Sequence, residues 1–378
     1  MERTITDLPA DRPAWRTTAS GMRTVEAFSR AVELAALGPA HGPNPRVGCV
    51  ITDPYGTVLG EGYHQGAGTA HAEVAALRDL RERGHNAVGA FAYVTLEPCS
   101  HTGRTGPCTQ ALHDAGIGAL RYAVEDPNPE AAGGGALLRD GGMDALFVPN
   151  EAAEKLNERW LAAMRRSRPY VIAKWGVTLD GRTAAADGTS FWITGDESRD
   201  HAHTVRGEVD AIVVGTNTVL IDNPSLSARP GGHETGHQPL RVVMGLRDTR
   251  STVTAPGRPA TATEPAQPGD GQALKVWRDD NVVAVHTHDP AEVLEELQRR
   301  EMRTVLIEGG ARVTTAFLAA GLVDEIHVYV APVILGSGTT AVGDLGITTM
   351  NRALRGQDVS TRQLGADTLV IAHVAKGT

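Results

Sequence analysis

A discontinuous set of four residues constrains this chain of 378 residues more than any other feature of its sequence. His71 and Glu73 belong to a His-Ala-Glu triplet, and Cys99 and Cys108 follow, each directly after a proline. An imidazole and two thiolates are ligands that Zn²⁺ accepts in a tetrahedral site, and three protein ligands leave the fourth position to water. We therefore interpret His71, Cys99 and Cys108 as ligands of one catalytic zinc, with Glu73 as the acid/base beside it.

The order of these residues resembles the signature of zinc-dependent base deaminases, in which His-x-Glu is followed by Pro-Cys-x-x-Cys. Here eight residues rather than two separate the cysteines, so both cannot lie on one helical turn. We expect Cys99 on the loop after a strand at residues 90–96. We expect Cys108 at the start of a helix, because the N-terminus of a helix stabilises a thiolate.

Two other interpretations of this cluster stay open. One is a closed structural zinc site, which needs a fourth ligand such as His101 or His64. That site would leave Glu73 without a role. The other is that these residues are unrelated in space.

Composition excludes several classes of protein. A net charge of −9 argues against a partner made of nucleic acid, because proteins that bind it usually present a basic surface. The length favours two domains. Three cysteines do not make a disulfide framework, and Cys49 lies in an apolar run typical of a core position. Neither a transmembrane stretch nor a signal peptide is indicated, so we expect a cytoplasmic protein with no membrane partner.

Strands and helices alternate along the chain, which predicts mostly parallel sheets flanked by helices. The first half is expected to contain helices at 23–37, 71–83, from Cys108 onward and at 151–166, and strands at 47–52, 58–62, 90–96 and 120–124. The second half is expected to contain strands at 170–175, 211–215, 241–244, 282–286, 304–308, 325–332 and 368–374, and helices at 197–208, 290–300 and 311–320.

This alternation restarts after the middle of the chain, which predicts the domain boundaries. We expect a disordered extension at 1–21, a first domain at 22–150 and a connecting helix and linker at 151–168. A second domain then occupies 169–378. Within it, residues 251–272 are rich in Thr, Ala, Pro and Gly and indicate a flexible insertion.

Two stretches of the second half are candidates for ligand binding. Glu308-Gly-Gly-Ala311 lies between a strand and a helix, where glycines let backbone N–H groups approach a phosphate. A tight turn that needs two glycines explains the same residues. The stretch from Gly215 to Arg229 gathers polar side chains after another strand and is equally typical of a capped helix or a solvated loop. Both follow strand ends, where ligands of open α/β sheets collect.

Over almost its whole length, the chain resembles the bifunctional deaminase–reductases of riboflavin biosynthesis, the RibD family. In the first half, the resemblance rests on Asn-Pro-Arg-Val-Gly at 44–48, the His71 triplet, and the run from Thr95 to Cys108, with the same spacing between the cysteines. In the second half, it rests on Lys174-x-x-x-Thr-Leu-Asp-Gly-Arg-Thr183, Trp-Ile-Thr at 192–194, the stretch 215–229, and Glu-Gly-Gly at 308–310. Residues 1–21 and 251–272 fall outside it.

The resemblance implies an α/β protein with a cytidine-deaminase-like three-layer α/β/α domain and a dihydrofolate-reductase-like α/β domain. The first would use one zinc ion to deaminate 2,5-diamino-6-ribosylamino-4(3H)-pyrimidinone 5′-phosphate. The second would use NADPH to reduce the ribosyl group to ribityl. The implied partners are these small pyrimidine ribotides and further copies of the chain, in a dimer or a tetramer.

The resemblance also implies roles for individual residues. Positions matching those that hold the deaminase substrate are Asn44, His64, His101, Arg104, Asp126 and Asn128. Positions matching those that hold NADPH are Gly176, Trp192, Thr218, Asp222, Gly310, Ala311 and Arg312. Positions matching those around the reductase substrate are Ser190, Arg206, Leu226, Arg229 and Glu308. For His64 and His101 the alternative is a surface histidine or one that only supports the residues in contact with the ligand. The alternative is a core position for Trp192, a surface position for Arg206 and a solvated charge for Arg104. None of these residues stands out as a proton donor for the reductase.

One departure from the family pattern follows the strand at 241–244. The family often has an acidic and a small polar residue there, whereas this chain has Met244-Gly-Leu-Arg247. Arg247 is placed to meet the 2′-phosphate of NADPH. The main alternative is therefore a deaminase with an inactive or repurposed reductase domain. An editing deaminase that acts on nucleic acid and a zinc-stabilised scaffold are the alternatives from other classes.

Overall fold

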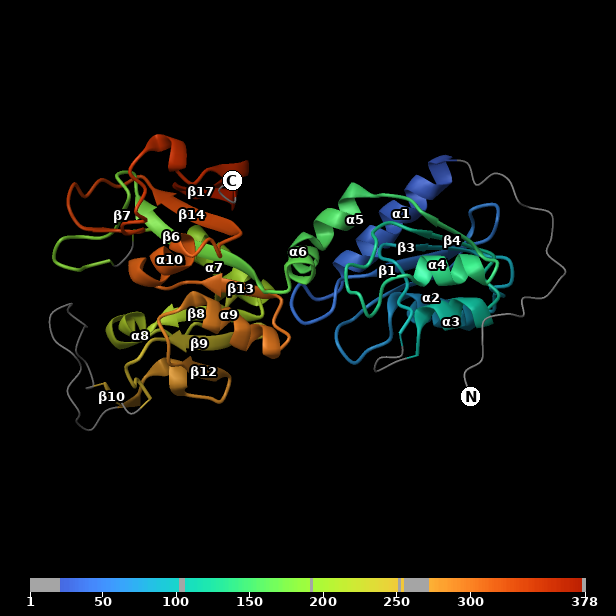
Figure 1. Cartoon of the computed structure of the whole chain (residues 1–378), viewed down its shortest axis with the longest axis horizontal. Coiled ribbons are helices and arrows are strands. Elements are labelled where there is room, and N and C mark those ends of the chain that lie inside the picture. The colour runs from blue at the N-terminus through green and yellow to red at the C-terminus, as the bar shows by residue number, and fades with distance from the viewer. Residues whose placement is uncertain (1–20, 102–105, 191–192, 251–252, 255–271, 376–378) are drawn as a thin grey trace. The chain divides into compact units, whose positions relative to one another are not determined.

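The computed structural model describes residues 21–101, 106–190, 193–250, 253–254 and 272–375. The chain divides into two compact units, Met1–Arg166 and Ser167–Thr378. Each unit has a central sheet with helices on both faces (Figure 1). Most of the expected extension at 1–21 and of the expected insertion at 251–272 lies outside the described residues.

The first unit contains five strands and six helices among its described residues. Its strands are β1 (Gly48–Thr52), β2 (Val58–Tyr63), β3 (Phe91–Val94), β4 (Ala119–Tyr122) and β5 (Asp144–Phe147). Its helices are α1 (Gly21–Ala36), α2 (Ala72–Glu82), α3 (Cys108–Asp114), α4 (Gly134–Asp140), α5 (Glu151–Leu156) and α6 (Glu158–Arg166).

The sheet of the first unit has the order β2-β1-β3-β4-β5. β1 is antiparallel to both of its neighbours, and β3, β4 and β5 are parallel to one another. Helices α2, α3 and α4 are neighbours on one face, and α1 packs with α5 and against β1. The unit therefore has three layers.

Close approach of helix and strand fixes where α2 begins. A Cβ atom on Gly62 of β2 would lie 2.3 Å from the backbone nitrogen of Ala76 in α2. On the other face, a Cβ atom on Gly48 of β1 would lie 2.0 Å from the carbonyl oxygen of Ala31 in α1. Only glycine allows backbones to approach so closely. Because α2 is held directly on the sheet, the residue that precedes it, His71, has a fixed position.

The single helix expected at 151–166 is wrong, because the structure breaks it at Asn157. The side chain of Asn157 accepts a hydrogen bond from the backbone N–H of Arg46 at 2.9 Å and donates one to its carbonyl at 2.7 Å. Asn157 is buried, and it ends α5 before α6 begins. This long-range contact was not visible in the local apolar pattern, which continues across both helices.

The second unit is built on a larger sheet. Its strands are β6 (Tyr170–Thr178), β7 (Arg182–Ala184), β8 (Ala211–Gly215), β9 (Leu240–Met244), β10 (Val253–Thr254), β11 (Gln272–Ala273), β12 (Val282–Val285), β13 (Thr304–Ile307), β14 (Glu325–Ala331), β15 (Thr339–Thr340), β16 (Gly356–Leu364) and β17 (Asp367–Val374). Its helices are α7 (Asp196–Glu208), α8 (Thr216–Asp222), α9 (Pro290–Arg299) and α10 (Ala311–Ala319).

Eight strands form this sheet in the order β12-β9-β8-β13-β6-β14-β17-β16. The strands from β12 to β14 are parallel, and the last two are antiparallel additions. Side chains of β6 point alternately to the two faces of the sheet, one of which is an apolar core and the other a cavity. Val171 and Ala173 belong to the apolar cluster with α9 and α10. Lys174 lies on the other face, where α7 and Tyr329 of β14 line a cavity.

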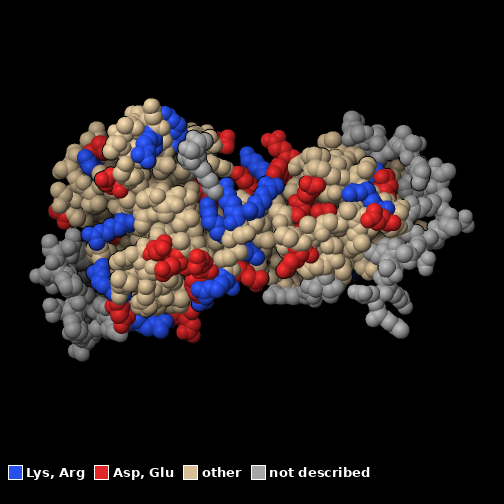
Figure 2. All heavy atoms as spheres, in the orientation of Figure 1, with Lys and Arg blue, Asp and Glu red and all other residues tan. Residues whose placement is uncertain are grey.

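In the described part of the second unit, β7, β10, β11, β15 and β16 were not predicted, and α8 was one of two open alternatives. β16 is exposed along all but its last residue, so its sequence lacks the alternation that marks a half-buried strand. The stretch after Gly215 is a helix, α8, only in its first half. This helix has no side-chain cap and ends at Asn223 in the left-handed conformation, and residues 224–229 are irregular. In the described residues, no helix is long and apolar enough to cross a membrane. On the face shown in Figure 2, acidic and basic side chains are interspersed over the described surface.

Candidate functional sites

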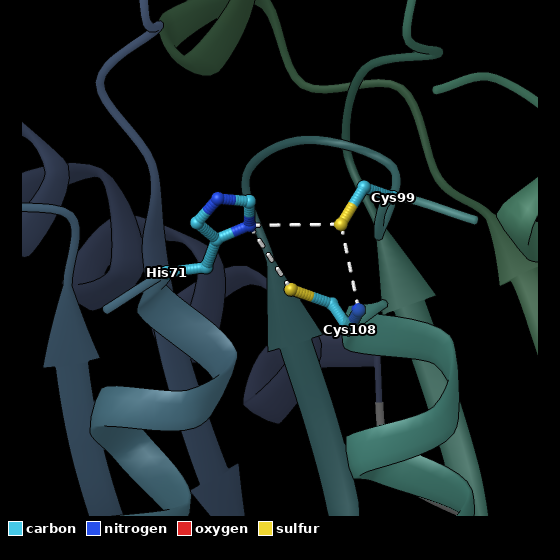
Figure 3. Close-up of side chains that lie close together, drawn as sticks. All are labelled: His71, Cys99 and Cys108. Atoms are coloured by element: carbon cyan, nitrogen blue, oxygen red, sulfur yellow. Dashed lines mark hydrogen bonds between the residues drawn. The ribbon is translucent and has the colours of Figure 1, made fainter. Parts of the chain in front are cut away.

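Three side chains of the first unit converge from different elements. His71 immediately precedes α2, Cys108 is the first residue of α3, and Cys99 lies in the loop after β3. Figure 3 shows the imidazole and the two sulfur atoms pointing toward one another. Their ligand atoms all lie within 4.8 Å of one another, and no other such group of His, Cys, Asp or Glu was found among the described residues.

The distances in this cluster suit a tetrahedral zinc. Nδ1 of His71 lies 3.2 Å from Sγ of Cys108 and 3.6 Å from Sγ of Cys99. Zinc bonds of about 2.0 Å to nitrogen and about 2.3 Å to sulfur, at a tetrahedral angle, separate two such ligands by about 3.5 Å. The backbone N–H of Cys108 donates to Sγ of Cys99 at 3.4 Å, and hydrogen bonds from Cys108 and His71 lower the pKa of Cys99 to about 4.

Glu73 lies in the first turn of α2 and is 3% exposed. Burial, reinforced by the charge of Cys99, raises the pKa of its carboxyl group. The side chain interacts with Cys108, so the carboxyl group adjoins the ligand cluster. A carboxyl group placed there can exchange a proton with a molecule bound at the open ligand position.

His64 and Asn44 form a fixed pair beside the cluster. Nδ1 of His64 lies 3.1 Å from the carbonyl oxygen of Ala70, and Nε2 lies 2.9 Å from the amide nitrogen of Asn44. Burial lowers the pKa of His64, so its ring is neutral. Nδ1 then donates to Ala70, and Nε2 accepts from Asn44. The ring packs edge-on against His71, with centroids 5.4 Å apart.

The other expected substrate residues of the first unit lie on two loops. Burial raises the pKa of Asp126 to about 6, and His101 and Cys99 both act on its charge. Nδ1 of His101 is buried and has no hydrogen-bond partner among the described residues. The side chain of Asn128 accepts the N–H of Glu130 in a local turn. Arg104 lies outside the described residues.

Sequence reasoning missed Glu97, which shapes this side of the site. Its carboxylate accepts the N–H of Gly135 at 2.9 Å and the N–H of Asp126 at 3.3 Å. Glu97 is 7% exposed. Its two hydrogen bonds connect the loop that contains Asp126 to the start of α4. The only sequence signal was its position one residue before the Pro-Cys dipeptide.

A cavity of about 220 Å³ opens in the second unit between α7 and the sheet. Its lining combines basic, hydroxyl and aromatic side chains. They are Lys174, Gly176, Thr194, Ser198, Arg199, Ala202, His203, Arg206 and Tyr329. Two of the expected site residues, Gly176 and Arg206, are among them.

A buried ion pair forms one wall of this cavity. Both guanidinium contacts from Arg206 to Glu308 measure 2.7 Å, and Nζ of Lys174 lies 3.8 Å from Oε2 of Glu308. Burial acts to raise the pKa of Glu308, but the charges of Arg206 and Lys174 outweigh it and lower the pKa to about 2. Burial also lowers the pKa of the Lys174 ammonium group. The arrangement presents an ionised carboxylate and an amine that can release a proton.

Sequence reasoning named Arg206 and Glu308 but assigned no role to Lys174, Tyr329 or His203. Lys174 is the first residue of the motif that ends at Thr183. It lies in the middle of an apolar strand, and this position indicated a buried charge. Tyr329 also lies in a strand and is 1% exposed. Its apolar neighbours made it look like an ordinary core residue.

The starts of α8 and α10 meet at a second position in this unit. The backbone N–H of Gly310, which caps α10, donates to Oγ1 of Thr218 in α8 at 3.3 Å. The guanidinium group of Arg247 donates to Oγ1 of Thr216 at 3.3 Å and to the side chain of Asn217. The first N–H groups of a helix lack partners within it, so α10 offers donors to an anion here.

The remaining expected residues of the second unit are spread over several segments, and those that the structure describes do not line the cavity. Ser190 and Asp222 are exposed, Asp222 being the last residue of α8. Leu226 is buried with a left-handed backbone at φ 55°, and the N–H of Arg229 donates to Nδ1 of His203 at 3.2 Å. Ala311 and Arg312 begin α10 beside Gly310. Trp192 lies outside the described residues.

Both halves match models of known families. Residues 22–124 match the cytidine and deoxycytidylate deaminase zinc-binding region, and residues 169–370 match the RibD C-terminal domain. The second match covers more than half of the chain. The predicted α/β class, with a cytidine-deaminase-like first domain and a reductase domain of the dihydrofolate-reductase-like class, is confirmed.

Similar proteins cover nearly the whole chain. The riboflavin biosynthesis protein RibD of Mycobacterium tuberculosis is 41% identical over 338 residues, which are 88% of this chain and 92% of that protein. The structure of Acinetobacter baumannii RibD, form 2, is 32% identical, with a TM-score of 0.79, and the match covers 94% of this chain and 99% of that chain.

A third relative comes from Thermotoga maritima and is named a diaminohydroxyphosphoribosylaminopyrimidine deaminase/5-amino-6-(5-phosphoribosylamino)uracil reductase. Its structure is 30% identical, with a TM-score of 0.75, over 94% of this chain and 99% of that chain. With both halves matched in one polypeptide, this chain belongs to the RibD family of riboflavin biosynthesis.

Proposed function

We propose that this chain catalyses two successive steps of riboflavin biosynthesis. The first unit deaminates 2,5-diamino-6-ribosylamino-4(3H)-pyrimidinone 5′-phosphate, and the second reduces the ribosyl group of the product to ribityl with NADPH. The observation that carries the proposal is the convergence of His71, Cys99 and Cys108 beside the buried Glu73. The charged cavity around Lys174 in the same chain supports the second step. The family match over 169–370 gives no support to a repurposed second domain.

His71, Cys99 and Cys108 would hold one Zn²⁺, because their donor set and spacing suit this ion. When bound, zinc supplies an acidified water as the nucleophile for the amino-bearing ring carbon. Two thiolates and a neutral imidazole cancel the charge of the ion, so a carboxylate must move the protons. Glu73 takes the proton of the attacking water and passes it to the leaving amine.

The residues around this centre hold the pyrimidine and the ribose phosphate. His64 is neutral and fixed by Ala70, so it orients the amide of Asn44 toward the ring. The further residues that we assign to the substrate are His101, Arg104, Asp126 and Asn128. The free Nδ1 of His101 supports its assignment, because a buried polar atom calls for a partner.

In the second unit, reduction requires a hydride and a proton. When bound, NADPH would supply the hydride for C1′, and the bond between C1′ and the ring oxygen would open. The ring oxygen then takes a proton, and Lys174 is the donor because its ammonium group lines the cavity and burial lowers its pKa. Glu308 attracts the ammonium group, and Arg206 and Glu308 bind substrate polar groups.

We assign the meeting point of α8 and α10 to the phosphates of NADPH. The residues assigned to the cofactor are Gly176, Trp192, Thr218, Asp222, Gly310, Ala311 and Arg312, with Arg247 for the 2′-phosphate. Residues Ser190, Leu226 and Arg229 join Arg206 and Glu308 around the substrate. The bond between Gly310 and Thr218 supports this assignment, because it brings both helix starts to one place.

We further infer a cytoplasmic homo-oligomer, a dimer or a tetramer. Thiolate ligands require a compartment that keeps cysteines reduced. Large apolar side chains are exposed in the 333–359 segment of the second unit, which supports contact with another copy. Light scattering on the purified protein measures the number of copies.

A paired assay tests the function. Purified, zinc-loaded protein receives the diaminopyrimidinone ribotide with NADPH, while ammonia release and the fall in NADPH absorbance are followed together. We expect both signals, with NADPH oxidation dependent on deamination. Ammonia without NADPH oxidation would refute the second step alone. The absence of both signals from folded protein would refute the assignment of function as a whole.

A further inference from the structure

The ring of Tyr329 is held on two sides in the second unit. Its hydroxyl group lies 2.8 Å from Nδ1 of His201 on α7, and Nζ of Lys174 lies over its face, 5.5 Å from the ring centroid. We propose that His201 is a positioning residue for the reductase: through Tyr329, it fixes the ammonium group of Lys174 against Glu308. This inference rests on the function proposed above for the second unit.

Lys174 is the loosely held member of the charged group. Both oxygens of Glu308 are occupied by Arg206 at 2.7 Å. The ammonium nitrogen of Lys174 is 3.8 Å from Glu308, beyond ordinary hydrogen-bond distance. The attraction between a cation and the face of an aromatic ring is therefore a main contact that places this group. Its position depends on the ring staying where it is.

The ring of Tyr329, in turn, depends on His201. Tyr329 is 1% exposed, and a buried hydroxyl group without a partner is unfavourable. Burial lowers the pKa of His201, and the unprotonated Nδ1 of a neutral ring can accept a hydrogen bond from the hydroxyl group. The rings lie with centroids 5.8 Å apart. Without this hydrogen bond, the buried hydroxyl group would lack a partner. The ring would then tilt to bring the hydroxyl group to another acceptor, which would change the ring face that Lys174 contacts.

His201 acts only through its neighbour. Tyr329 lines the cavity, whereas His201 is not among the lining residues. Ala202, His203 and Arg206 on the same helix do line it, so α7 carries both direct contacts to the cavity and this indirect one. A residue of this kind should change turnover without changing how tightly the cofactor binds.

Two substitutions at His201 separate the hydrogen bond from the bulk of the side chain. Asparagine carries its oxygen at the place of Nδ1 relative to Cβ and can accept the same hydrogen bond, whereas leucine cannot. The assay supplies the deaminated intermediate with NADPH, so that the first unit is not needed. We expect H201L and Y329F each to lower kcat about tenfold with KM for NADPH unchanged, and H201N to stay within about twofold of the natural protein.

The double variant H201L/Y329F is the decisive comparison. If His201 acts through Tyr329, the double variant is no slower than the slower single variant. Multiplied effects, equal losses in H201N and H201L, or full activity in H201L would each overturn the proposal. Unchanged hydrogen exchange in β6 and β14 shows that the second unit of the variants is folded.

A second measurement needs no turnover and so separates this inference from the proposed function. The rate at which an amine reagent labels Lys174, followed by mass spectrometry across pH, reports how its ammonium group is held. We expect H201L to raise the labelling rate of Lys174 and H201N to leave it unchanged. If the natural protein fails to reduce the intermediate but this pattern appears, only the function has failed. Equal labelling in all three proteins refutes the positioning role.

Discussion

Glu73 and Glu308 are both buried glutamates at the candidate sites of their units, yet their pKa values move in opposite directions. Burial raises the pKa of Glu73, while the nearby charges of Cys99 and His71 act on it in opposite directions. Glu308 faces Arg206 and Lys174, whose charges lower its pKa to about 2. Burial alone favours the neutral acid, so the neighbouring charge decides the sign. The first carboxyl group is suited to carry a proton, and the second to remain an anion.

The two sites also differ in how they are built. The first takes its ligand atoms from two helix starts and one loop within a short part of the chain. The second draws on β6, α7, β14 and Glu308, the residue that follows β13. The first site depends on the positions of three ligand atoms. The second depends on buried charges that compensate one another. Replacing the buried glutamate should therefore mainly lower turnover at the first site and mainly lower stability at the second.

The largest effect is expected for Glu73→Gln. The amide keeps the size of the side chain but cannot move a proton, so kcat for deamination should fall by about 10²–10⁴-fold. Zinc content by metal analysis should stay at the level of the natural protein, because Glu73 is not a ligand. Reduction of the deaminated intermediate serves as the matched control and should not change. Full deamination in this variant would remove Glu73 from the chemistry.

Glu308→Gln should instead destabilise the second unit. Removing one partner of a buried ion pair typically costs about 3–5 kcal/mol, because the remaining charges stay buried without compensation. Hydrogen exchange can report the loss separately for the strands of each unit. We expect faster exchange in β13 and β6 and unchanged exchange in β3 and β4. Equal exchange in the second unit would mean that Glu308 contributes no net stability.

The pH dependence of this loss follows from the lowered pKa. The ordinary value for Glu308 is 4.5, and the folded value is about 2. Its contribution to stability is therefore complete above pH 4.5 and is lost as the pH falls toward 2, by about 1.4 kcal/mol per pH unit. The difference between the natural protein and the Gln variant should shrink over this window. A constant difference would show that Glu308 is not ionised by its neighbours.

The contrast between the sites explains what the sequence could predict. His71, Cys99 and Cys108 are recognisable because metal chemistry restricts residue type and order. Lys174 and Tyr329 lie in apolar strands, and their meeting depends on the pairing of β6 with β14, which no local pattern encodes.

The same limit applies to the fold. β8 is a continuous apolar run and α9 has apolar residues at helical spacing, and both were predicted. The break at Asn157 depends on Arg46, more than a hundred positions earlier, and β16 has no buried face to create a pattern. Contacts between distant segments were thus the main source of error.

A smaller effect is expected for Arg247, which tests whether the second site also recognises a particular anion. Its guanidinium group is exposed and held by Thr216 and Asn217 at the start of α8. Replacing it with methionine should raise KM for NADPH about tenfold, the size expected for one charged hydrogen bond. KM for NADH, which lacks the 2′-phosphate, should not change. Equal effects on both cofactors would place Arg247 away from that phosphate.

The smallest effect is expected from shortening the segment between β10 and β11. Thr254 pairs with Gln272 at the base of this segment, so the two strands form a hairpin. Deleting residues 256–270 leaves Ala255 and Gly271 as a two-residue loop, and A255N then gives the Asn-Gly pair that favours a tight hairpin turn. Loop-closure entropy changes slowly with length, so the unfolding free energy should change by less than about 2 kcal/mol. Both activities should stay within about twofold, and loss of one alone would assign the segment to that site.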